Sequence, residues 1–156
     1  MARQEREKPE DRARCVTGID GLDNILSGGI PRGNTVLVTG SVGTGKTSLC
    51  LEFLVHGALA GENSLFISAT EASDKLLQNI IPYDFFDRKL IKDGRLVFLD
   101  FRVIYDRLGL EKTEFDFEEI NILIRALGNI ADELKVKRFV IDSITSVCYR
   151  LKTQEN

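Results

Sequence analysis

Residues 40–47 read Gly40-Ser41-Val42-Gly43-Thr44-Gly45-Lys46-Thr47, which matches the pattern G-x-x-x-x-G-K-T. An apolar run at 35–39 precedes this octapeptide, and a long apolar segment at 48–59 follows it. This order predicts a strand, a glycine-rich loop and a helix, which is the context that a phosphate-binding loop requires.

The residue types of this loop suit a triphosphate. Backbone N–H groups can surround phosphate oxygens only where no Cβ blocks the approach, so glycines stand at 40, 43 and 45. The helix that begins near Gly45 adds unpaired N–H groups and the positive end of its dipole. Lys46 would reach the β- and γ-phosphates, and the Thr47 hydroxyl would bind Mg²⁺. The loop therefore predicts nucleotide binding through Gly40, Gly43, Gly45, Lys46 and Thr47.

The totals describe an ordinary globular chain. Its 156 residues are enough for one domain or part of one, with 43% hydrophobic and 29% charged residues. A net charge of −3 argues against nucleic-acid binding by bulk charge, although it leaves a local basic patch open. The charged N-terminus and the lack of an apolar run long enough to span a bilayer predict a cytosolic protein with no membrane partner. Because they show no metal-ligand spacing, the three cysteines Cys15, Cys50 and Cys148 are predicted to be buried free thiols in a reducing compartment.

Apolar periodicity predicts an α/β protein. Residues 1–15 are mostly charged and are expected to form a disordered arm, which leaves 16–156 as the folded domain. Strands are expected at 35–39, 64–68, 95–100 and 138–142, helices at 21–26, 47–60, 73–81, 83–92 and 120–134, and a loop at 102–114. Ser73 or Thr70 should cap the third of these helices, and Asp116 with Glu119 resembles a capping box for the last. Strands that alternate with helices imply a mainly parallel sheet covered on both faces.

Acidic residues follow three of the predicted strands. Asp142 ends an apolar strand in the Walker B form, and ligands of parallel α/β sheets bind at the carboxyl ends of strands, so Asp142 should face a metal ion beside Lys46 and Thr47. Asp100 also ends a strand, and we interpret it as a turn residue. Glu71 follows the strand at 64–68, where it could orient or deprotonate a water molecule. It could equally be an acid in the first turn of the next helix, and the sequence leaves both roles open.

Read together, these motifs resemble the KaiC branch of the RecA/RadA-type ATPases over roughly residues 16–150. The likeness lies in Thr17-Gly18-Ile19-Asp20-Gly21-Leu22-Asp23, Gly28-Gly29-Ile30-Pro31-Arg32-Gly33, the phosphate loop, Phe66-Ile67-Ser68-Ala69-Thr70-Glu71, Phe115-Asp116-Phe117 and Val140-Ile141-Asp142-Ser143-Ile144-Thr145-Ser146-Val147. The resemblance implies a RecA-like P-loop NTPase core of three layers that binds ATP and Mg²⁺. By position, Gly43, Thr44, Gly45, Lys46, Thr47 and Ser48 would contact phosphate, and Thr47 and Asp142 would hold the metal.

The resemblance also implies an activity and an assembly. Family members act as rings, usually hexameric, with nucleotide between subunits, and clock-protein members hydrolyse ATP slowly and phosphorylate their own Ser and Thr residues. The expected function is therefore magnesium-dependent ATP binding with slow hydrolysis, in which Lys46 and Glu71 are the catalytic residues. Two other hypotheses are a RadA-type DNA-handling ATPase, which the net acidity disfavours, and a nucleotide sensor that does not hydrolyse ATP.

The chain departs from the family pattern in two places. Relatives of the KaiC branch often carry paired glutamates after the second strand, and here Thr70 replaces the first, so that only Glu71 remains. Family cores also continue beyond the Walker B strand with a strand that inserts beside the phosphate-loop strand. We expect a core truncated after the Walker B strand, with exposed strand edges that favour pairing with another chain.

Overall fold

A three-stranded parallel sheet forms the centre of the fold. The computed structural model describes residues 13–110 and 117–148, and its sheet has the order β4-β3-β5. The strands are β3 (Asn63–Ser68), β4 (Leu96–Asp100) and β5 (Val136–Asp142). Both neighbours run parallel to β3, and Ser68 pairs with Asp100 on one side and with Asp142 on the other. This register brings the carboxyl ends of all three strands to one edge.

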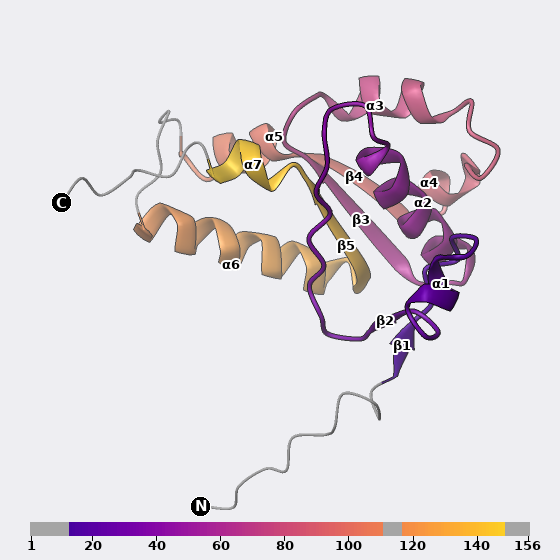
Figure 1. The fold of residues 1–156 in the computed structure, drawn as a ribbon. Coiled ribbons are helices and arrows are strands. Elements are labelled where there is room, and N and C mark those ends of the chain that lie inside the picture. Colours follow the sequence, from indigo (N-terminus) through magenta and orange to yellow (C-terminus); the bar gives the residue numbers. More distant parts are fainter. Residues whose placement is uncertain (1–12, 111–116, 149–156) are drawn as a thin grey trace, which may run out of the picture.

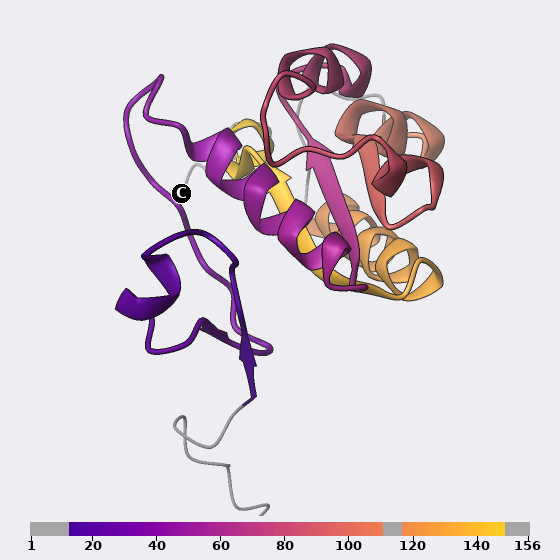
Figure 2. The same ribbon diagram turned by 90° about the vertical axis from the view of Figure 1, so that its right-hand side faces the viewer.

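Helices cover both faces of this sheet, as Figures 1 and 2 show. One face carries α2 (Lys46–Leu59), α3 (Ser73–Ile80) and α4 (Lys89–Lys92), and the other carries α5 (Phe101–Arg107) and α6 (Phe117–Glu133). A short helix, α7 (Ile144–Cys148), follows β5. Each face has its own apolar core, since alternate side chains of a strand point to opposite faces. Phe66 packs on the α2 side, whereas Leu65 and Ile67 pack on the α6 side. The predicted three-layer α/β core with a parallel sheet is confirmed.

A small N-terminal unit precedes the sheet. It contains β1 (Arg14–Cys15), α1 (Leu22–Ile25) and β2 (Ile30–Pro31), and β1 pairs antiparallel with β2. The Arg14 guanidinium donates to the carbonyl oxygens of Leu26 and Gly29 at 3.0 and 2.9 Å, which closes this unit. Arg14 and Cys15 therefore belong to a strand, although the sequence placed them in the charged arm. The remaining arm residues, 1–12, lie outside the described residues.

Asp23 organises the loop that contains the Thr17-to-Asp23 motif. Its carboxylate accepts hydrogen bonds from the Thr17 N–H and hydroxyl and from the Gly18 N–H, at 2.8, 2.9 and 2.9 Å. Burial opposes ionisation of Asp23, but these hydrogen bonds outweigh it and lower the pKa of the carboxyl group. The motif is thus explained by local structure, because Asp23 holds the buried Thr17 in place.

The strand predicted at 35–39 does not form, which is a correction to the sequence prediction. Residues 34–41 carry no strand, and the side chains of Val36 and Leu37 are 56% and 72% exposed. Among the described residues β5 pairs with β3 alone, and Figure 2 shows the segment between β2 and α2 standing away from the sheet. Apolar side chains do not make a strand by themselves, because its backbone N–H and C=O groups need a partner strand.

The predicted loop at 102–114 is also wrong over its first half, where α5 forms. Phe101, Ile104 and Tyr105 are buried at the spacing i, i+3, i+4, which is one face of a helix. Arg102 and Asp106 lie on the exposed face and pair weakly at 3.9 Å. In a helix of only two turns, these polar residues make the apolar periodicity too short to recognise in the sequence. Residues 111–116 lie outside the described residues.

Strand β4 supplies the cap of α3, which corrects the prediction of Ser73 or Thr70. The N-cap position is Ala72, and the Asp100 carboxylate accepts from the Ser73 N–H at 2.6 Å and from the Ser73 hydroxyl. Asp100 therefore lacks the turn role that was expected from the sequence, because its carboxylate binds Ser73, 27 residues away, and caps no turn of its own segment. A cap that comes from another strand depends on the tertiary fold, so the local sequence could not reveal it.

Three further predictions concern the helix at 83–92, the cysteines and the capping box. Only Lys89–Lys92 is helical within the helix predicted at 83–92. Cys15 is buried and Cys50 is half-buried, as free thiols, but Cys148 is exposed because the described part of α7 buries no side chain. The capping box predicted for Asp116 and Glu119 cannot be placed, since Asp116 lies outside the described residues.

The Asp23 loop generates a prediction about stability. Asp23→Ala should lower the free energy of unfolding by about 1–3 kcal/mol at neutral pH, because the buried Thr17 hydroxyl and N–H lose their acceptor. The native pKa of Asp23 is lowered, so its stabilising contribution is complete above its ordinary value of 3.8 and is lost as the pH falls through the native pKa. The deficit of the variant should therefore shrink below pH 3.8 in denaturant titrations. Asp20→Ala, in the same loop, is the control, and an equal deficit in both variants would contradict the role of Asp23.

Candidate nucleotide-binding site

The phosphate loop wraps into the N-terminus of α2 with the geometry that its glycines predict. Gly43 and Gly45 have φ angles of 81° and 83°, a left-handed conformation that favours glycine, and Gly45 is the N-cap of α2. No side chain caps this 14-residue helix, so its first N–H groups face the loop. A Cβ built on Gly43 or Gly45 would meet no atom within 4 Å. The loop thus leads into an uncapped helix N-terminus and leaves open space beside Gly43 and Gly45, as a phosphate group requires.

Lys46 folds back over this loop. Its ammonium group donates to the carbonyl oxygens of Gly40 and Ser41 at 2.9 and 2.8 Å. The Thr44 hydroxyl also donates to Ser41 O, at 2.9 Å. Among the described residues Lys46 makes no ion pair, so its charge is held by carbonyl groups that an incoming phosphate oxygen could replace.

The hydroxyl of Thr47 meets the carboxylate of Asp142 across 95 residues of sequence. Thr47 Oγ1 donates to Asp142 Oδ2 at 2.5 Å. Cys50, one turn further along α2, lies close enough that burial and, to a smaller extent, the Asp142 charge raise the pKa of its thiol. The two residues proposed from sequence as metal ligands are therefore neighbours, one on the phosphate-loop helix and one at the end of β5.

The sheet fixes the position of Asp142 relative to the segment that carries Glu71. Ser68 pairs with Asp142 in the β3–β5 ladder, and the Ala69 N–H donates to Asp142 O at 2.7 Å. The Ser68 hydroxyl then donates to Glu71 O at 2.6 Å and accepts from the Glu71 N–H at 3.3 Å. Two short links thus anchor the backbone of Glu71 at the same sheet edge as Asp142.

The side chain of Glu71 is half-buried, and within the described part of the chain it forms no hydrogen bond or ion pair. Helix α3 begins at Ser73, and the acid in its first turn is Asp74. Glu71 lies ahead of the N-cap, so the alternative role of a first-turn acid belongs to Asp74. Among the described residues, the Glu71 carboxylate thus lies without a partner at the carboxyl edge of the sheet.

The residues present fit a magnesium ion that arrives with phosphate. Residues 13–110 and 117–148 hold no group of three or more His, Cys, Asp or Glu side chains that could hold a metal by themselves. Thr47 and Asp142 instead supply two hard oxygen atoms beside a phosphate-binding loop. Mg²⁺ takes such a donor set, since it is commonly bound by one or two protein oxygens together with substrate phosphates and water.

A neighbouring aromatic pair touches the start of α2. The hydroxyl groups of Ser48 and Tyr83 lie 3.3 Å apart, and the Tyr83 and Phe85 rings stack with centroids 5.2 Å apart. Tyr83 is 44% exposed. The connection between α3 and α4 therefore borders the phosphate loop on the α2 face of the sheet.

An ionic cluster around the buried Arg138, behind the site, was not predicted from the sequence. Arg138 of β5 donates from Nε to Glu62 Oε2 at 2.6 Å, and Arg32 also pairs with Glu62. Burial opposes ionisation of Glu62, but hydrogen bonds from Arg138 and Arg32 outweigh it and lower the pKa of this carboxyl group. One signal for this cluster is present in the sequence. Arg138 lies two positions before Val140 and four before Asp142, so its side chain is on the same face of an apolar strand as theirs.

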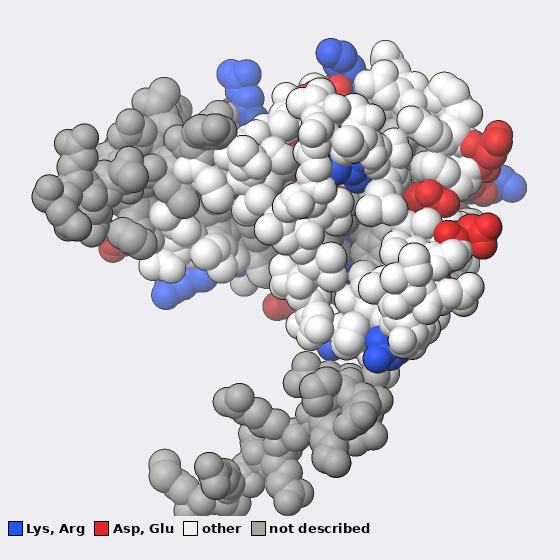
Figure 3. All heavy atoms as spheres, in the orientation of Figure 1, with Lys and Arg blue, Asp and Glu red and all other residues white. Residues whose placement is uncertain are grey.

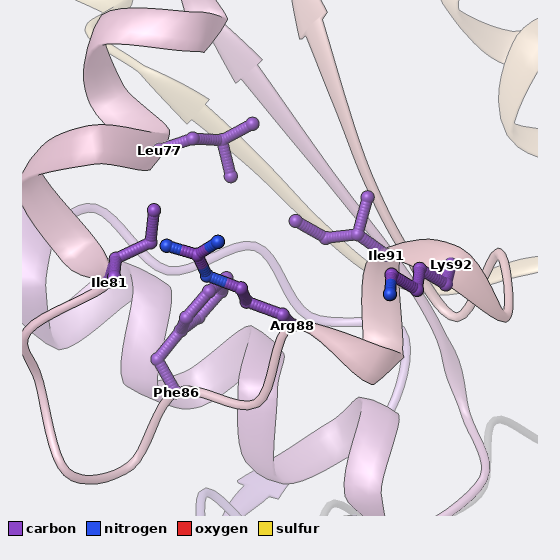
Figure 4. Close-up of a pocket in the computed structure, with 6 residues that line it drawn as sticks. All are labelled: Leu77, Ile81, Phe86, Arg88, Ile91 and Lys92. Atoms are coloured by element: carbon purple, nitrogen blue, oxygen red, sulfur yellow. The ribbon is translucent and has the colours of Figure 1, made fainter.

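The apolar pocket of Figure 4 lies apart from the phosphate loop. It is a shallow depression between α3 and α4, lined by Leu77, Ile81, Phe86, Arg88, Ile91 and Lys92. None of these residues belongs to the loop or to the Thr47–Asp142 pair. Leu77 and Phe86 also pack against the α2-side core, so the pocket is a dent in the surface of that core.

On the face shown in Figure 3, basic side chains are scattered and form no continuous stripe. In the described ranges, each helix is too short or too polar to cross a lipid bilayer.

Comparison with known proteins places these features in a family. Residues 15–156 match the KaiC ATPase family. The circadian clock oscillator protein KaiC of Acaryochloris marina is 34% identical over 136 residues, which are 86% of this chain and 25% of that protein. A UPF0273 protein of Pyrococcus furiosus is 31% identical over 137 residues, which are 86% of this chain and 56% of that protein.

A solved structure agrees. The crystal structure of a KaiC-like protein from Pyrococcus horikoshii superposes with a TM-score of 0.71 at 32% identity, over 90% of this chain and 58% of that one. The chain thus spans between a quarter and just over half the length of these relatives. By family match, sequence identity and fold, the chain belongs to the KaiC family of RecA-like P-loop ATPases.

Proposed function

We propose that this chain binds ATP together with Mg²⁺ and hydrolyses it slowly. The observation that carries the proposal is the 2.5 Å contact between Thr47 Oγ1 and Asp142 Oδ2 beside a phosphate loop with open space at Gly43 and Gly45. Membership of the KaiC ATPase family supports an ATP-binding core.

Each site residue then has a definite task. The N–H groups of the loop and of the first turn of α2, from Gly40 and Gly43 through Thr44 and Gly45 to Ser48, surround the phosphates. Lys46 exchanges its carbonyl contacts for phosphate oxygens and stabilises charge that develops on the γ-phosphate. Thr47 and Asp142 would hold Mg²⁺, which neutralises phosphate charge when bound.

Glu71 orients the attacking water or accepts its proton. Its backbone is anchored beside Asp142 and its carboxylate is free of other partners among the described residues. Thr70, exposed at the position where relatives carry another glutamate, adds no second carboxylate. A single acid supports slow rather than fast turnover.

The full protein extends these roles. By family resemblance, we propose that the chain functions in the cytoplasm as part of a homo-oligomeric ring, hexameric in arrangement, with nucleotide held between subunits. Autophosphorylation of Ser or Thr residues belongs to the same proposal.

A nucleotide sensor without turnover is the second candidate function. The observation that favours it is that no hydrogen bond or ion pair joins the Glu71 carboxylate to Lys46, Thr47 or Asp142 among the described residues. In that case ATP would change the state of the protein by binding alone. A DNA-handling role has no comparable support, since no basic stripe crosses the visible face of Figure 3.

The first prediction of this proposed function concerns Lys46. Lys46→Ala should weaken binding of Mg·ATP by about 10- to 100-fold, because it removes a charged donor to phosphate. Isothermal titration calorimetry measures this change, with Lys75→Ala on the exposed face of α3 as the matched control. Equal affinities of wild type and Lys46→Ala would defeat the proposal.

The second prediction separates hydrolysis from sensing. Glu71→Gln should lower kcat for ATP about a hundredfold while leaving ATP affinity unchanged, because it removes the base and keeps the shape. Thr70→Glu should raise kcat by supplying a second carboxylate. Asp74→Asn is the control for a helix-dipole effect and should leave kcat unchanged. Phosphate release is the readout, and tight ATP binding with no turnover in the wild type would establish the sensor instead.

A further inference from the structure

Arg138 is a buried cation whose three nitrogen atoms each serve a different segment. Its side chain is 4% exposed. Nε donates to Glu62, Nη1 donates to Phe53 O of α2 at 2.8 Å, and Nη2 donates to Val16 O of the N-terminal unit at 2.8 Å. The guanidinium also lies 4.7 Å from the centroid of the Phe53 ring. One residue of β5 thus binds α2, the turn after α2 and the N-terminal unit together.

Helix α2 is shaped to admit this side chain. A Cβ on Gly57 would lie 2.3 Å from both Cδ and Nε of Arg138, so the arginine crosses the helix where glycine leaves room. Glycine in a helix interior costs about 1 kcal/mol relative to alanine. The helix therefore carries a residue that weakens it at the point where Arg138 passes.

We call the contacts of Arg138 with Phe53 and Gly57 of α2 the clamp. The clamp and the Thr47–Asp142 pair both join α2 to β5, and they lie at similar separations along the helix and along the strand. The four residue steps from Arg138 to Asp142 span about 13 Å along β5. The six steps from Thr47 to Phe53 and the ten steps from Thr47 to Gly57 span about 9–15 Å along α2. Helix α2 lies along β5 in Figure 2, so Arg138 holds its far half while Thr47 meets Asp142 at the site. A shift of α2 by one residue would move Thr47 by about 1.5 Å from its partner.

We propose that Arg138 is a positioning residue for the magnesium–nucleotide site, which fixes the register of α2 against β5 and thereby holds Thr47 opposite Asp142. This inference rests on the proposed function. Stability alone explains the arrangement poorly, because a buried ion pair often stabilises no more than apolar residues of similar volume, whereas fixing a unique register is an attested use of buried charge. The bond to the Phe53 carbonyl performs this task, and the Glu62 carboxylate balances the charge of the guanidinium.

The test compares nucleotide affinity with and without magnesium. A fluorescent N-methylanthraniloyl ATP analogue is titrated in Mg²⁺ and in EDTA, and the ratio of the two affinities is the magnesium increment. Arg138→Met should reduce this increment about tenfold while the affinity in EDTA stays near that of the wild type, since the loop itself is unchanged. Arg138→Lys should not restore the increment, because a single ammonium cannot bridge all three acceptors.

Two control variants remove contacts of other charged side chains but leave the bonds from Arg138 to α2 in place. Glu62→Gln loses the ion pair but leaves the Arg138 bonds to Phe53 O and Val16 O, so it should lower the melting temperature and retain the increment. Arg95→Met loses bonds to Gly61 O and Asn63 Oδ1, which do not join α2 to β5, and should also retain it.

A second disruption of the clamp covers the case in which Arg138→Met does not fold. Gly57→Ala keeps the guanidinium but fills the space of its Cδ and Nε, and it should reduce the increment in the same way. Combined with Arg138→Met, it should cause no further loss.

The outcomes separate the inference from the proposed function. A wild-type protein with no magnesium increment overturns the proposed function and this inference with it. A normal wild-type increment that Arg138→Met and Gly57→Ala retain overturns the inference alone. Equal losses of affinity in Mg²⁺ and in EDTA also overturn it, since they mark a merely structural residue.

Discussion

The hydrogen bond from Thr47 to Asp142 is the contact on which the site depends, because it joins the start of the phosphate-loop helix to the end of a strand 95 residues later. It requires α2 to pack against β5 in one register and β5 to lie beside β3. The ladder between β3 and β5 then places Glu71 at the same edge through Ser68 and Ala69. The phosphate loop, the Thr47–Asp142 pair and the Glu71 carboxylate therefore reach one edge because parallel strands end together.

Charged groups behind the site hold the surrounding segments. Asp23 closes the loop of the N-terminal unit, and Glu62 receives both Arg32 of that unit and Arg138 of the sheet. The unit leads directly into residues 34–41 and the phosphate loop. Of these two carboxyl groups with lowered pKa values, Asp23 closes the N-terminal unit on itself, and Glu62 ties that unit to the core.

Local sequence patterns predicted the elements whose structure depends on their own residues. They failed to predict the elements whose structure depends on residues that are distant in the sequence. The phosphate loop, the buried strand β3 and the pairing of Thr47 with Asp142 follow from glycine positions, apolar runs and the common end of parallel strands. The strand at 35–39 was wrong because its existence needs a neighbour, and the cap of α3 was wrong because Asp100 supplies it from another strand. The role of Arg138 could not be predicted from the sequence, because only the fold shows that its side chain reaches α2 and Val16.

The central claim is that Thr47 and Asp142 act as one unit that holds magnesium with the nucleotide. A double-mutant cycle of Thr47→Val and Asp142→Asn tests it most directly, with ATP affinity measured calorimetrically in Mg²⁺ and in EDTA. We expect each single variant to lose about tenfold of the affinity gained from magnesium, and the double variant to lose no more than the worse single variant. Fully additive losses, or single variants that keep the gain, would contradict the account.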